Sequence, residues 1–418
     1  MIAALVFFLS IAAASPFAAQ NGSVTWGSTV RIADPPTYSV AGAYARHIHP
    51  GKFGADYPRA LRLTDGSWLC TYTGYEKGNR GYLAGPRGGT RIFVDKSAGG
   101  GKSWKQIAML SDPGRDLDNG EMIQLPDGSI LLATRSVRWQ ESYRLPVYRS
   151  TDNGKTWKYL SDIDSNEGKS GQLGHPDKGV YEPHFYQLDP HTLAVMCSSE
   201  KHVVENPSYS QIISEKLSHD NGATWGKEIW VAAKTGGYRP GMPVWTRMKN
   251  GKYIVTFEVC GPDNCRIHSK TSNDGIRWPS GLGTVVPSEI GAPYVLALKD
   301  GRLILTSNNH QVSMSGDYGK SWHLIAPAFQ GGPRIAYRSS LYQTGRDEIM
   351  LLTGLRRPEG GRRIVARFGK LSPMPVHVHT PDGKPLASAS SGTVQHDRVL
   401  IEPSSLQSGR PLDLAIRT

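Results

Sequence analysis

A short pattern, Ser-x-Asp-x-Gly-x-Thr/Ser-Trp, recurs along the chain and constrains its fold more than any other feature. Full copies lie at residues 150–157, 218–225 and 315–322, and weaker copies lie at 97–104 and 271–278. The Asp is suited to accept hydrogen bonds from backbone N–H groups of its own turn, and the Gly permits a positive φ. The Trp supplies an apolar plug under the turn. The pattern therefore predicts a series of similar hairpin turns.

The spacing of these turns indicates a repeat protein. Consecutive copies begin about 45–70 residues apart, close to the length of one blade of a β-propeller. A second repeat alternates with the first and consists of an apolar strand, a tight turn of the Asp-Gly type and another apolar strand. Its copies lie at 57–73, 120–135, 181–197, 242–258, 292–308 and 337–353. Six such hairpins predict six blades.

The expected fold is therefore an all-β, six-bladed β-propeller of four-stranded blades. In each blade a third strand, the Trp turn and a fourth strand follow the hairpin. The sixth hairpin is followed by a third strand at 363–368 but not by a Trp turn. We expect the N-terminal segment 23–32 to supply the missing outer strand, because this pairing closes the ring and leaves no open edge.

The chain of 418 residues divides into three segments. Residues 1–19 form an apolar run ending in small residues, which is typical of a cleaved secretory signal peptide and too short for a membrane span. Residues 20–373 hold the predicted propeller, and residues 374–418 form an extension that the repeats do not explain. We therefore expect a secreted, extracellular protein that does not bind a membrane, and we expect a monomer.

The net charge of +12 narrows the range of partners. Basic residues are scattered rather than clustered in runs, which argues against a nucleic-acid partner. Long-range attraction to an acidic polysaccharide such as pectin, and a solvated surface without a specific partner, both remain open. No Cys/His spacing resembles a metal site and no nucleotide or flavin motif is present, so we expect no metal and no cofactor.

Four cysteines in an exported chain permit disulfides. Cys260 and Cys265 flank the short loop Gly-Pro-Asp-Asn, and we expect this pair to be bonded. Cys70 and Cys197 lie inside apolar strand patterns, where buried free thiols are expected. Because the loop begins two residues after Glu258, the disulfide either supports the backbone of that residue or is a surface staple.

The topology places the candidate site at one end of the propeller. Both kinds of turn lie at the same end of a blade, so the starts of first strands and the ends of second strands meet at the opposite end, around the central channel. Candidates at first-strand starts are Tyr57, Arg59, Glu121, Glu182, Met242, Tyr294, Tyr337 and Arg338. Candidates at second-strand ends are Thr73, Arg135, Glu200, Glu258 and Asn308.

Glu182 and Glu258 are the strongest candidates for chemistry. Each borders a strongly apolar strand, where an ionised group is costly unless it has a partner or a catalytic role. They belong to the third and fourth blades, which are adjacent, so facing carboxylates are geometrically natural. Two carboxylates flanking a sugar are the apparatus of glycoside hydrolysis, about 5–5.5 Å apart for retention and further apart for inversion.

At these positions the chain resembles glycoside hydrolase family 93, the exo-α-1,5-L-arabinanases, and its Trp turn resembles the Asp-box of sialidase-type propellers. The resemblance spans about residues 23–372 and rests on Tyr57-Pro-Arg59, Tyr181-Glu-Pro183, Gly241-Met-Pro-Val244, the strand ending in Glu258, and Tyr337-Arg-Ser339. It implies a retaining hydrolase that releases arabinobiose from the non-reducing end of linear arabinan. Glu258 would be the nucleophile, Glu182 the acid/base, and Tyr337 a hydrogen-bonding partner beside them.

Six further residues complete the expected site as substrate-binding groups: Tyr57, Arg59, Glu121, Arg135, Tyr294 and Arg338. The substrate would be a polysaccharide or oligosaccharide, with arabinan side chains of pectin as the expected class. Arg135 and Arg338 have a purely structural alternative as partners in salt bridges between blades.

Two other functions remain open. An exo-sialidase of this fold has Phe-Arg-Ile-Pro in its first blade and an arginine triad. The corresponding stretch here is Tyr57-Pro-Arg-Ala60, although Arg59, Arg135 and Arg338 can still form a triad by another route. A non-catalytic propeller lectin tends to repeat one sugar site in every blade, whereas the candidate positions here differ from blade to blade, which favours one asymmetric site.

Overall fold

The computed structural model describes residues 22–34, 54–75, 90–138, 141–168, 178–332 and 334–373. It also describes the short strands β2 (Tyr38–Val40), β3 (Gly51–Phe53), β27 (Thr393–Gln395) and β28 (Arg398–Leu400). The chain divides into two compact units, Val24–Leu371 on one hand and the terminal segments Met1–Ser23 and Ser372–Thr418 on the other. In the terminal unit β27 pairs with β28. The expected signal peptide lies outside the described residues.

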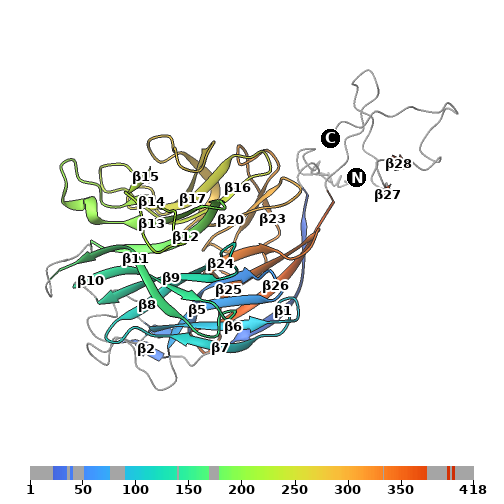
Figure 1. Cartoon of the computed structure of the whole chain (residues 1–418). Helices are drawn as coiled ribbons and strands as arrows, with labels where there is room; N and C mark the ends of the chain where they lie inside the picture. The colour runs from blue at the N-terminus through green and yellow to red at the C-terminus, as the bar shows by residue number, and fades with distance from the viewer. Residues whose placement is uncertain are drawn as a thin grey trace, which may run out of the picture. The chain divides into compact units, whose positions relative to one another are not determined.

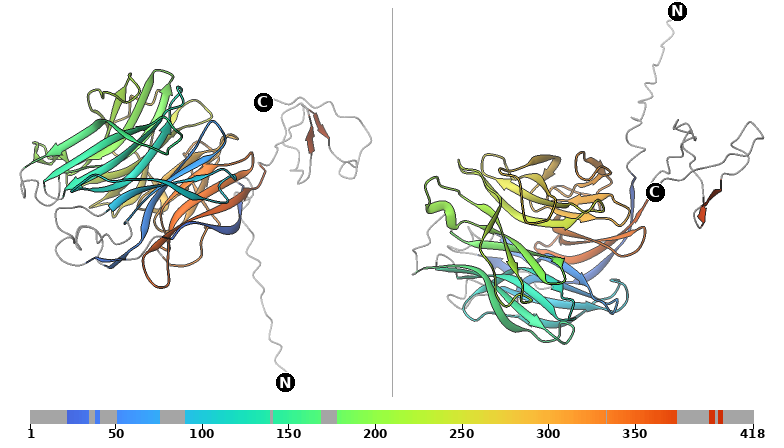
Figure 2. Two further views of the ribbon diagram at one scale, coloured as in Figure 1. Left: turned by 60° about the horizontal axis from the view of Figure 1, so that its bottom comes forward. Right: turned by 45° about the horizontal axis from the view of Figure 1, so that its top comes forward.

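The unit Val24–Leu371 contains six antiparallel sheets of four strands, one for each blade (Figure 1 and Figure 2). The first blade consists of β4 (Ala55–Arg62), β5 (Trp68–Tyr75), β6 (Thr90–Ser97) and β7 (Lys105–Leu110). The second consists of β8 (Asp116–Gln124), β9 (Ile130–Arg138), β10 (Ser142–Ser150) and β11 (Lys158–Glu167). The third consists of β12 (Val180–Asp189), β13 (Thr192–Ser199), β14 (Ile212–Ser218) and β15 (Ile229–Ala232). The next two are β16 (Arg239–Arg247), β17 (Tyr253–Cys260), β18 (Arg266–Ser272) and β19 (Thr284–Ile290); and β20 (Tyr294–Ala297), β21 (Leu303–Thr306), β22 (Val312–Ser315) and β23 (His323–Ile325). The sixth blade combines β24 (Ala336–Gln343), β25 (Glu348–Arg356) and β26 (Arg362–Leu371) with the N-terminal strand β1 (Val24–Ala33).

This architecture confirms the predicted all-β, six-bladed propeller. The first strands of consecutive blades contact one another, and β24 of the last blade contacts β4 of the first, which completes the ring. Helix is almost absent from the described residues, where η3 (Lys201–Val204) is a single 3-10 turn. None of the described helical structure has the length and apolar character needed to cross a membrane.

The N-terminal strand closes the ring as predicted. β1 pairs antiparallel with β26, in a register that runs from Val24 opposite Leu371 to Ala33 opposite Ile364. Figure 1 shows β1, in blue, beside β26, in orange. The two ends of the unit therefore share one sheet, and this pairing covers an edge of β26 that would otherwise be open.

The Trp turns contain the hydrogen bonds that the sequence pattern predicts. In the second blade the Asp152 carboxylate accepts from the backbone N–H groups of Lys155 (3.1 Å) and Thr156 (2.9 Å), and from Thr156 Oγ1 (2.6 Å). Ser150 Oγ donates to Asp152 Oδ1 at 2.8 Å and accepts the N–H of Gly154 at 2.9 Å. The turn is thus closed by its own side chains. In the weaker copy at 271–278 the serine role falls to Ser272, which makes that turn one residue shorter.

The glycine of the turn also sets how closely neighbouring blades pack. Gly154 has a φ of +85°, and a β-carbon there would lie 2.8 Å from Leu69 of the preceding blade. Gly222 and Gly319 approach Leu131 and Ile254 of their preceding blades in the same way, at 2.7 and 2.8 Å. A glycine is therefore needed both for the backbone conformation and for the close contact. Each turn packs its blade against the one before.

In every blade one residue near the start of the first strand has a positive φ, the left-handed backbone conformation, and these six residues form the candidate site. These residues are Tyr57 (φ 54°), Asn119 (58°), Glu182 (60°), Met242 (53°), Ala292 (43°) and Arg338 (52°). In every blade but the fifth the strand pairing shifts register at this point, and in the fifth the residue lies just before β20. Residues other than glycine rarely adopt this conformation, and a bulge changes the direction in which a side chain leaves the strand.

Candidate active site

We call the six left-handed residues, Tyr57, Asn119, Glu182, Met242, Ala292 and Arg338, the floor of the candidate site. Tyr57, Met242 and Ala292 pack together as a small buried cluster, although they come from the first, fourth and fifth blades. The guanidinium carbon of Arg338, in the sixth blade, lies 5.9 Å from the centre of the Tyr57 ring. The bulges therefore bring residues from distant parts of the chain together around the central channel.

Glu182 lies on this floor with one carboxylate oxygen fixed. Its Oε2 accepts hydrogen bonds from Ser198 Oγ at 2.9 Å and from the backbone N–H of Met242 at 2.8 Å. Ser198 belongs to β13, the strand paired with the one that carries Glu182, whereas Met242 belongs to the next blade. The carboxylate is thus held between two blades while the residue as a whole is only half-buried.

Glu258 stands near the end of β17 and is held in the same manner. Its Oε2 accepts the backbone N–H of Ala292, in the following blade, at 2.7 Å. Its Oε1 lies 3.6 Å from Cys260 Sγ. Burial, and then the negative charge of Glu182, raise the pKa of Glu258 to about 7, against the opposing effect of the Ala292 N–H. This carboxyl group therefore retains a proton at a higher pH than an ordinary glutamate does.

Gly241 lies between the two glutamates. It is the direct partner of Glu258 in the pairing of β16 with β17. A β-carbon on Gly241 would lie 3.7 Å from Glu182 Oε2 and 2.6 Å from Gln211 Nε2. The missing side chain makes room for the Gln211 amide, and Glu182 lies at an ordinary contact distance from Gly241, beside the strand pair that carries Glu258. The structure thus brings together the two carboxylates that the sequence singled out.

Two of the expected substrate-binding arginines form ion pairs at the floor. Arg338 is itself a floor residue, and Arg135 lies beside the floor. Arg135 Nη2 lies 2.9 Å from Asp118 Oδ2. Arg338 Nη1 lies 3.6 Å from Asp56 Oδ2 and 3.9 Å from Asp118 Oδ2. The sequence analysis missed both aspartates. The sequence feature that could have identified them is a shared position, because each directly precedes a floor residue in its hairpin.

Arg59, Glu121 and Tyr294 lie one layer beneath the floor. Each follows a floor residue by two positions, and lies beyond the register shift of its strand or, for Tyr294, at the start of β20. Arg59 Nε lies 3.5 Å from Glu121 Oε2, and the Arg59 guanidinium lies 4.0 Å from the Tyr57 ring and 5.2 Å from the Tyr294 ring. All three are buried. The structure thus places these expected substrate-binding residues in contact with one another beneath Tyr57.

His184 joins this lower layer, and the sequence analysis did not single it out. Its Nε2 lies 3.9 Å from Glu121 Oε1, and its ring packs against Tyr294. Burial raises the pKa of Glu121 to about 8 although Arg59 opposes the shift. Burial, assisted by Arg59, lowers the pKa of His184 to about 3. The surroundings therefore favour the uncharged form of both side chains.

Tyr337 directly precedes the floor residue Arg338. The centre of its ring lies 4.4 Å from the guanidinium carbon of Arg362 and 5.1 Å from that of Arg338. Its backbone N–H donates to Thr353 Oγ1 at 2.9 Å. The structure thus places Tyr337 at the edge of the floor, against two cationic groups.

Arg239 is a further cation near the carboxylates that the sequence analysis did not find. It forms an ion pair with Glu200 and donates to Gln211 Oε1 at 3.0 Å. Its backbone faces Cys260 in the pairing of β16 with β17, and its charge is one of the influences that lower the pKa of Glu258. Its side chain is 34% exposed. The sequence feature that could have identified Arg239 is its position as the first residue of a first strand.

Cys260 and Cys265 form a disulfide, as predicted. Cys70 and Cys197 are free and buried. In the part of the chain that the structure describes, no group of three or more His, Cys, Asp or Glu side chains is arranged to hold a metal ion.

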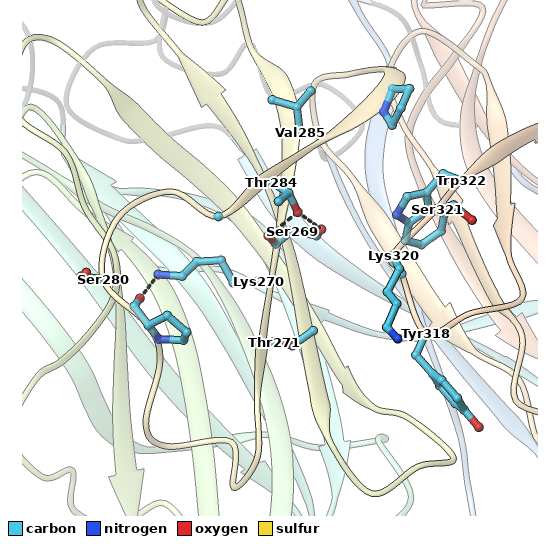
Figure 3. Close-up of a pocket in the computed structure, with 14 residues that line it drawn as sticks. Ser269, Lys270, Thr271, Ser280, Thr284, Val285, Tyr318, Lys320, Ser321 and Trp322 are labelled. Carbon is cyan, nitrogen blue, oxygen red and sulfur yellow. Dashed lines mark hydrogen bonds between the residues drawn. The ribbon is translucent and has the colours of Figure 1, made fainter.

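A groove of about 680 Å³ lies away from this floor, between the outer strands of the fourth and fifth blades. Figure 3 shows Lys270 on one side of it and Tyr318, Lys320 and Trp322 on the other. The Lys270 ammonium group is already engaged by carbonyl oxygens, including that of Gly281 at 2.8 Å. Tyr318 and Trp322 belong to a Trp turn, so the groove lies at the opposite end of the blades from the two glutamates.

Comparison with known proteins agrees with this fold. Residues 91–345, more than half of the chain, match the family model described as a BNR repeat-like domain. A sequence search among curated proteins finds no match.

Three solved structures illustrate the likeness. An α-L-arabinanase of Penicillium chrysogenum complexed with arabinobiose is 20% identical, with a TM-score of 0.66 over 83% of this chain and 98% of that one. An α-L-arabinofuranosidase of glycoside hydrolase family 93 from Fusarium graminearum, also with arabinobiose, is 22% identical, with a TM-score of 0.65 over 82% and 98%. The NanB sialidase of Streptococcus pneumoniae is 11% identical, with a TM-score of 0.51 over 76% and 68%. At these identities the likeness establishes the fold.

Proposed function

This chain belongs to the family of BNR repeat-like domains, and on that premise we propose that it is a secreted, retaining glycoside hydrolase. It acts on chain ends of linear α-1,5-L-arabinan and releases arabinobiose from the non-reducing end. The similar structures of an arabinanase and a family 93 arabinofuranosidase, both with arabinobiose, support this choice of sugar.

The observation that carries the proposal is the arrangement of Glu182 and Glu258 on either side of Gly241. Each carboxylate rests on the backbone N–H of a floor residue in the next blade, Met242 or Ala292. Retaining hydrolysis needs a carboxylate nucleophile and a carboxylic acid about 5–5.5 Å apart. Two like charges at short range do not both ionise readily, so such a pair holds one proton near neutral pH. The raised pKa of Glu258 fits this description.

In the proposed mechanism Glu258 attacks the anomeric carbon and Glu182 protonates the departing oxygen. Glu182 then takes a proton from the water that hydrolyses the glycosyl-enzyme. In the free protein, burial and the charge of Glu182 favour a protonated Glu258, whereas a nucleophile must be ionised. In the proposed mechanism substrate contacts favour the ionised form of Glu258, and the proton moves to Glu182. This transfer removes the negative charge of Glu182, which had favoured protonation of Glu258.

Packing closes the channel beneath the two carboxylates. Tyr57, Met242 and Ala292 pack together at the floor, and Arg59 and Glu121 are buried beneath them. A polysaccharide therefore cannot thread through the propeller. The choice of chain ends rests on the resemblance of the site residues to family 93.

Ion pairing of the site arginines favours a neutral sugar over a sialic acid. Arg135 is paired with Asp118, and Arg338 lies 3.6 Å from Asp56 and 3.9 Å from Asp118. The nearby Arg239 is paired with Glu200. A sialidase binds the carboxylate of its substrate with arginines, whereas carboxylates of the protein already oppose the charge of these three.

Export and the surroundings of the protein are part of the proposal. The apolar run at 1–19 supports secretion, and the net charge of +12 supports attraction to acidic polysaccharide that carries arabinan. A monomer without cofactor is sufficient for this chemistry, because both carboxylates come from one chain.

Product analysis on debranched linear arabinan tests the function. Wild type should release arabinobiose as its early product, and Glu182→Gln and Glu258→Gln should each lower kcat by about 10²–10⁴-fold. An aryl α-arabinobioside with a nitrophenolate leaving group separates the roles. This substrate needs no protonation of the leaving group, so it should rescue bond cleavage in Glu182→Gln but not in Glu258→Gln.

Glu215→Gln provides a matched control. Glu215 is also a buried carboxyl of the third blade whose pKa burial raises to about 8, but it accepts the indole N–H of Trp278 in a Trp turn. This variant should retain full activity. Turnover of a sialoside without release from arabinan would contradict the proposal in favour of a sialidase, and glycan binding without turnover would indicate a lectin.

A further inference from the structure

The loop closed by the Cys260–Cys265 disulfide contacts Glu258 directly. Cys260 Sγ lies 3.6 Å from Glu258 Oε1, the oxygen opposite the one that accepts the Ala292 N–H. A disulfide sulfur has no proton to donate, so this contact is one of packing. It limits rotation of the carboxylate about its last torsion.

The other end of the disulfide reaches Glu258 by a second route. The carbonyl oxygen of Cys265 accepts the N–H of Gly291 at 2.8 Å, and the carbonyl of Gly291 accepts the N–H of Asn308, also at 2.8 Å. Gly291 is followed by Ala292, whose N–H binds Glu258 Oε2. Cys260, Cys265, Gly291 and Ala292 therefore form a closed series of contacts that begins and ends at the Glu258 carboxylate.

The backbone of this loop is held in a conformation that it would not keep unaided. Asn264 and Cys265 are both left-handed, with φ of 54° and 58°, and Gly261 has a φ of 80°. A non-glycine residue in this region costs about 1 kcal/mol or more unless the surroundings impose it. The covalent bond between Cys260 and Cys265 adds to the constraint of the hairpin, in which Val259 pairs with Arg266 and the Asn264 N–H donates to the Gly261 carbonyl at 3.0 Å. Breaking the bond allows Cys265, whose carbonyl accepts the Gly291 N–H, to move relative to Cys260.

We propose that the Cys260–Cys265 disulfide is a positioning group for Glu258, and that its reduction disables the catalytic carboxylate without unfolding the propeller. The proposal rests on the catalytic role of Glu258 given above. The sensitivity belongs to this bond alone, because the chain has four cysteines and the other two, Cys70 and Cys197, are free and buried. Dithiothreitol supplies the two electrons and two protons for reduction and leaves as its cyclic disulfide.

Kinetics with and without dithiothreitol test the proposal, with product measured by chromatography. Reduction of the wild type should lower kcat roughly tenfold to hundredfold, the scale of a small misplacement of a reacting group, with little change in KM. The Cys260→Ser/Cys265→Ser double variant should show the same low kcat and no response to dithiothreitol. Circular dichroism should show a folded propeller in both cases. Unchanged kcat in the reduced protein and in the double variant would overturn the proposal.

Titration of Glu258 by NMR of ¹³C-labelled glutamate carboxyl groups gives a readout independent of activity, with Glu258→Gln for assignment. Burial is the main cause of the raised pKa of Glu258, so a loosened loop that admits water should shift the titration midpoint downward. An identical midpoint in the double variant would contradict positioning. This experiment needs no substrate. It therefore tests the positioning role separately from the proposed function.

Discussion

Glu121 is a residue that the sequence suggested for substrate binding and that the structure buries beneath the floor. Its carboxyl group lies near Arg59 and His184, with burial as the main influence on its ionisation. A carboxyl in such surroundings favours folding while it is protonated and opposes folding once it must ionise. Its contribution to the free energy of unfolding therefore depends on pH in a defined direction.

Replacing Glu121 by Gln should remove this pH dependence. The pKa is raised to about 8 in the folded protein from an ordinary value of 4.5, so the stabilisation is complete below about pH 4.5 and is lost as the pH rises through about 8. Relative to wild type, Glu121→Gln should gain stability between pH 5 and 8, by an amount on the order of 1–3 kcal/mol. Chemical denaturation at several pH values measures this difference, and a constant difference would contradict the prediction.

Single residues also show which features of the candidate site are visible in the sequence. Glu182, Glu258 and the bonded cysteines stand out because a charge beside an apolar strand, or two cysteines around a short loop, can be recognised without a structure. The division between the floor and the layer beneath it was not visible, because it depends on a bulge in each first strand. In a regular strand Tyr57 and Arg59 would lie on the same face as equivalent candidates, and Asp56 would lie on the other face and would not be a candidate.

At the scale of structural elements, the Trp turn stabilises the blade that carries it and lies at the end of that blade opposite the two glutamates. Asp152 shows this clearly, since hydrogen bonds from Thr156 are the main cause that lowers its pKa to about 2. A depressed carboxyl pKa contributes stability above the unfolded value and loses it as the pH falls through the folded one. The turn should therefore weaken only in acid, between about pH 4 and 2.

Asp152→Ala should lower the free energy of unfolding at pH 7 by about 1 kcal/mol, because it deletes charge-assisted hydrogen bonds at an exposed turn. Asp152→Asn keeps an acceptor oxygen and should cost less. Both variants should keep wild-type kcat, since the turn lies at the end of the blade opposite the floor. Urea unfolding and arabinan assays measure the two effects, and a loss of activity without a loss of stability would be inconsistent with this role.

The elements themselves were largely predictable. Hairpins with Asp-Gly turns and the repeated Trp turn fix strand order, turn position and blade number, because both patterns encode local backbone geometry. The turn at 271–278 was placed one residue too early, since Thr271 and Ser272 both offer a hydroxyl and only the fold selects Ser272. Local sequence leaves such a choice undecided.

At the scale of the whole propeller, closure of the ring and packing of the channel bring the starts of the six first strands together around one axis. β1 completes the last blade and β24 meets β4, so the first strands are fixed around the axis. The floor residues differ in every blade, which gives one asymmetric site rather than six equal ones. This arrangement suits an enzyme that holds one chain terminus between two unlike carboxylates.

The stereochemistry of hydrolysis tests this conclusion most directly. Proton NMR of the reaction with linear arabinan, recorded before mutarotation, reports the anomeric configuration of the first-formed arabinobiose. The proposed nucleophilic role of Glu258 predicts retention, so the α-anomer should appear first and the β-anomer should grow in later. Early appearance of the β-anomer would show inversion and would contradict the roles assigned to Glu182 and Glu258.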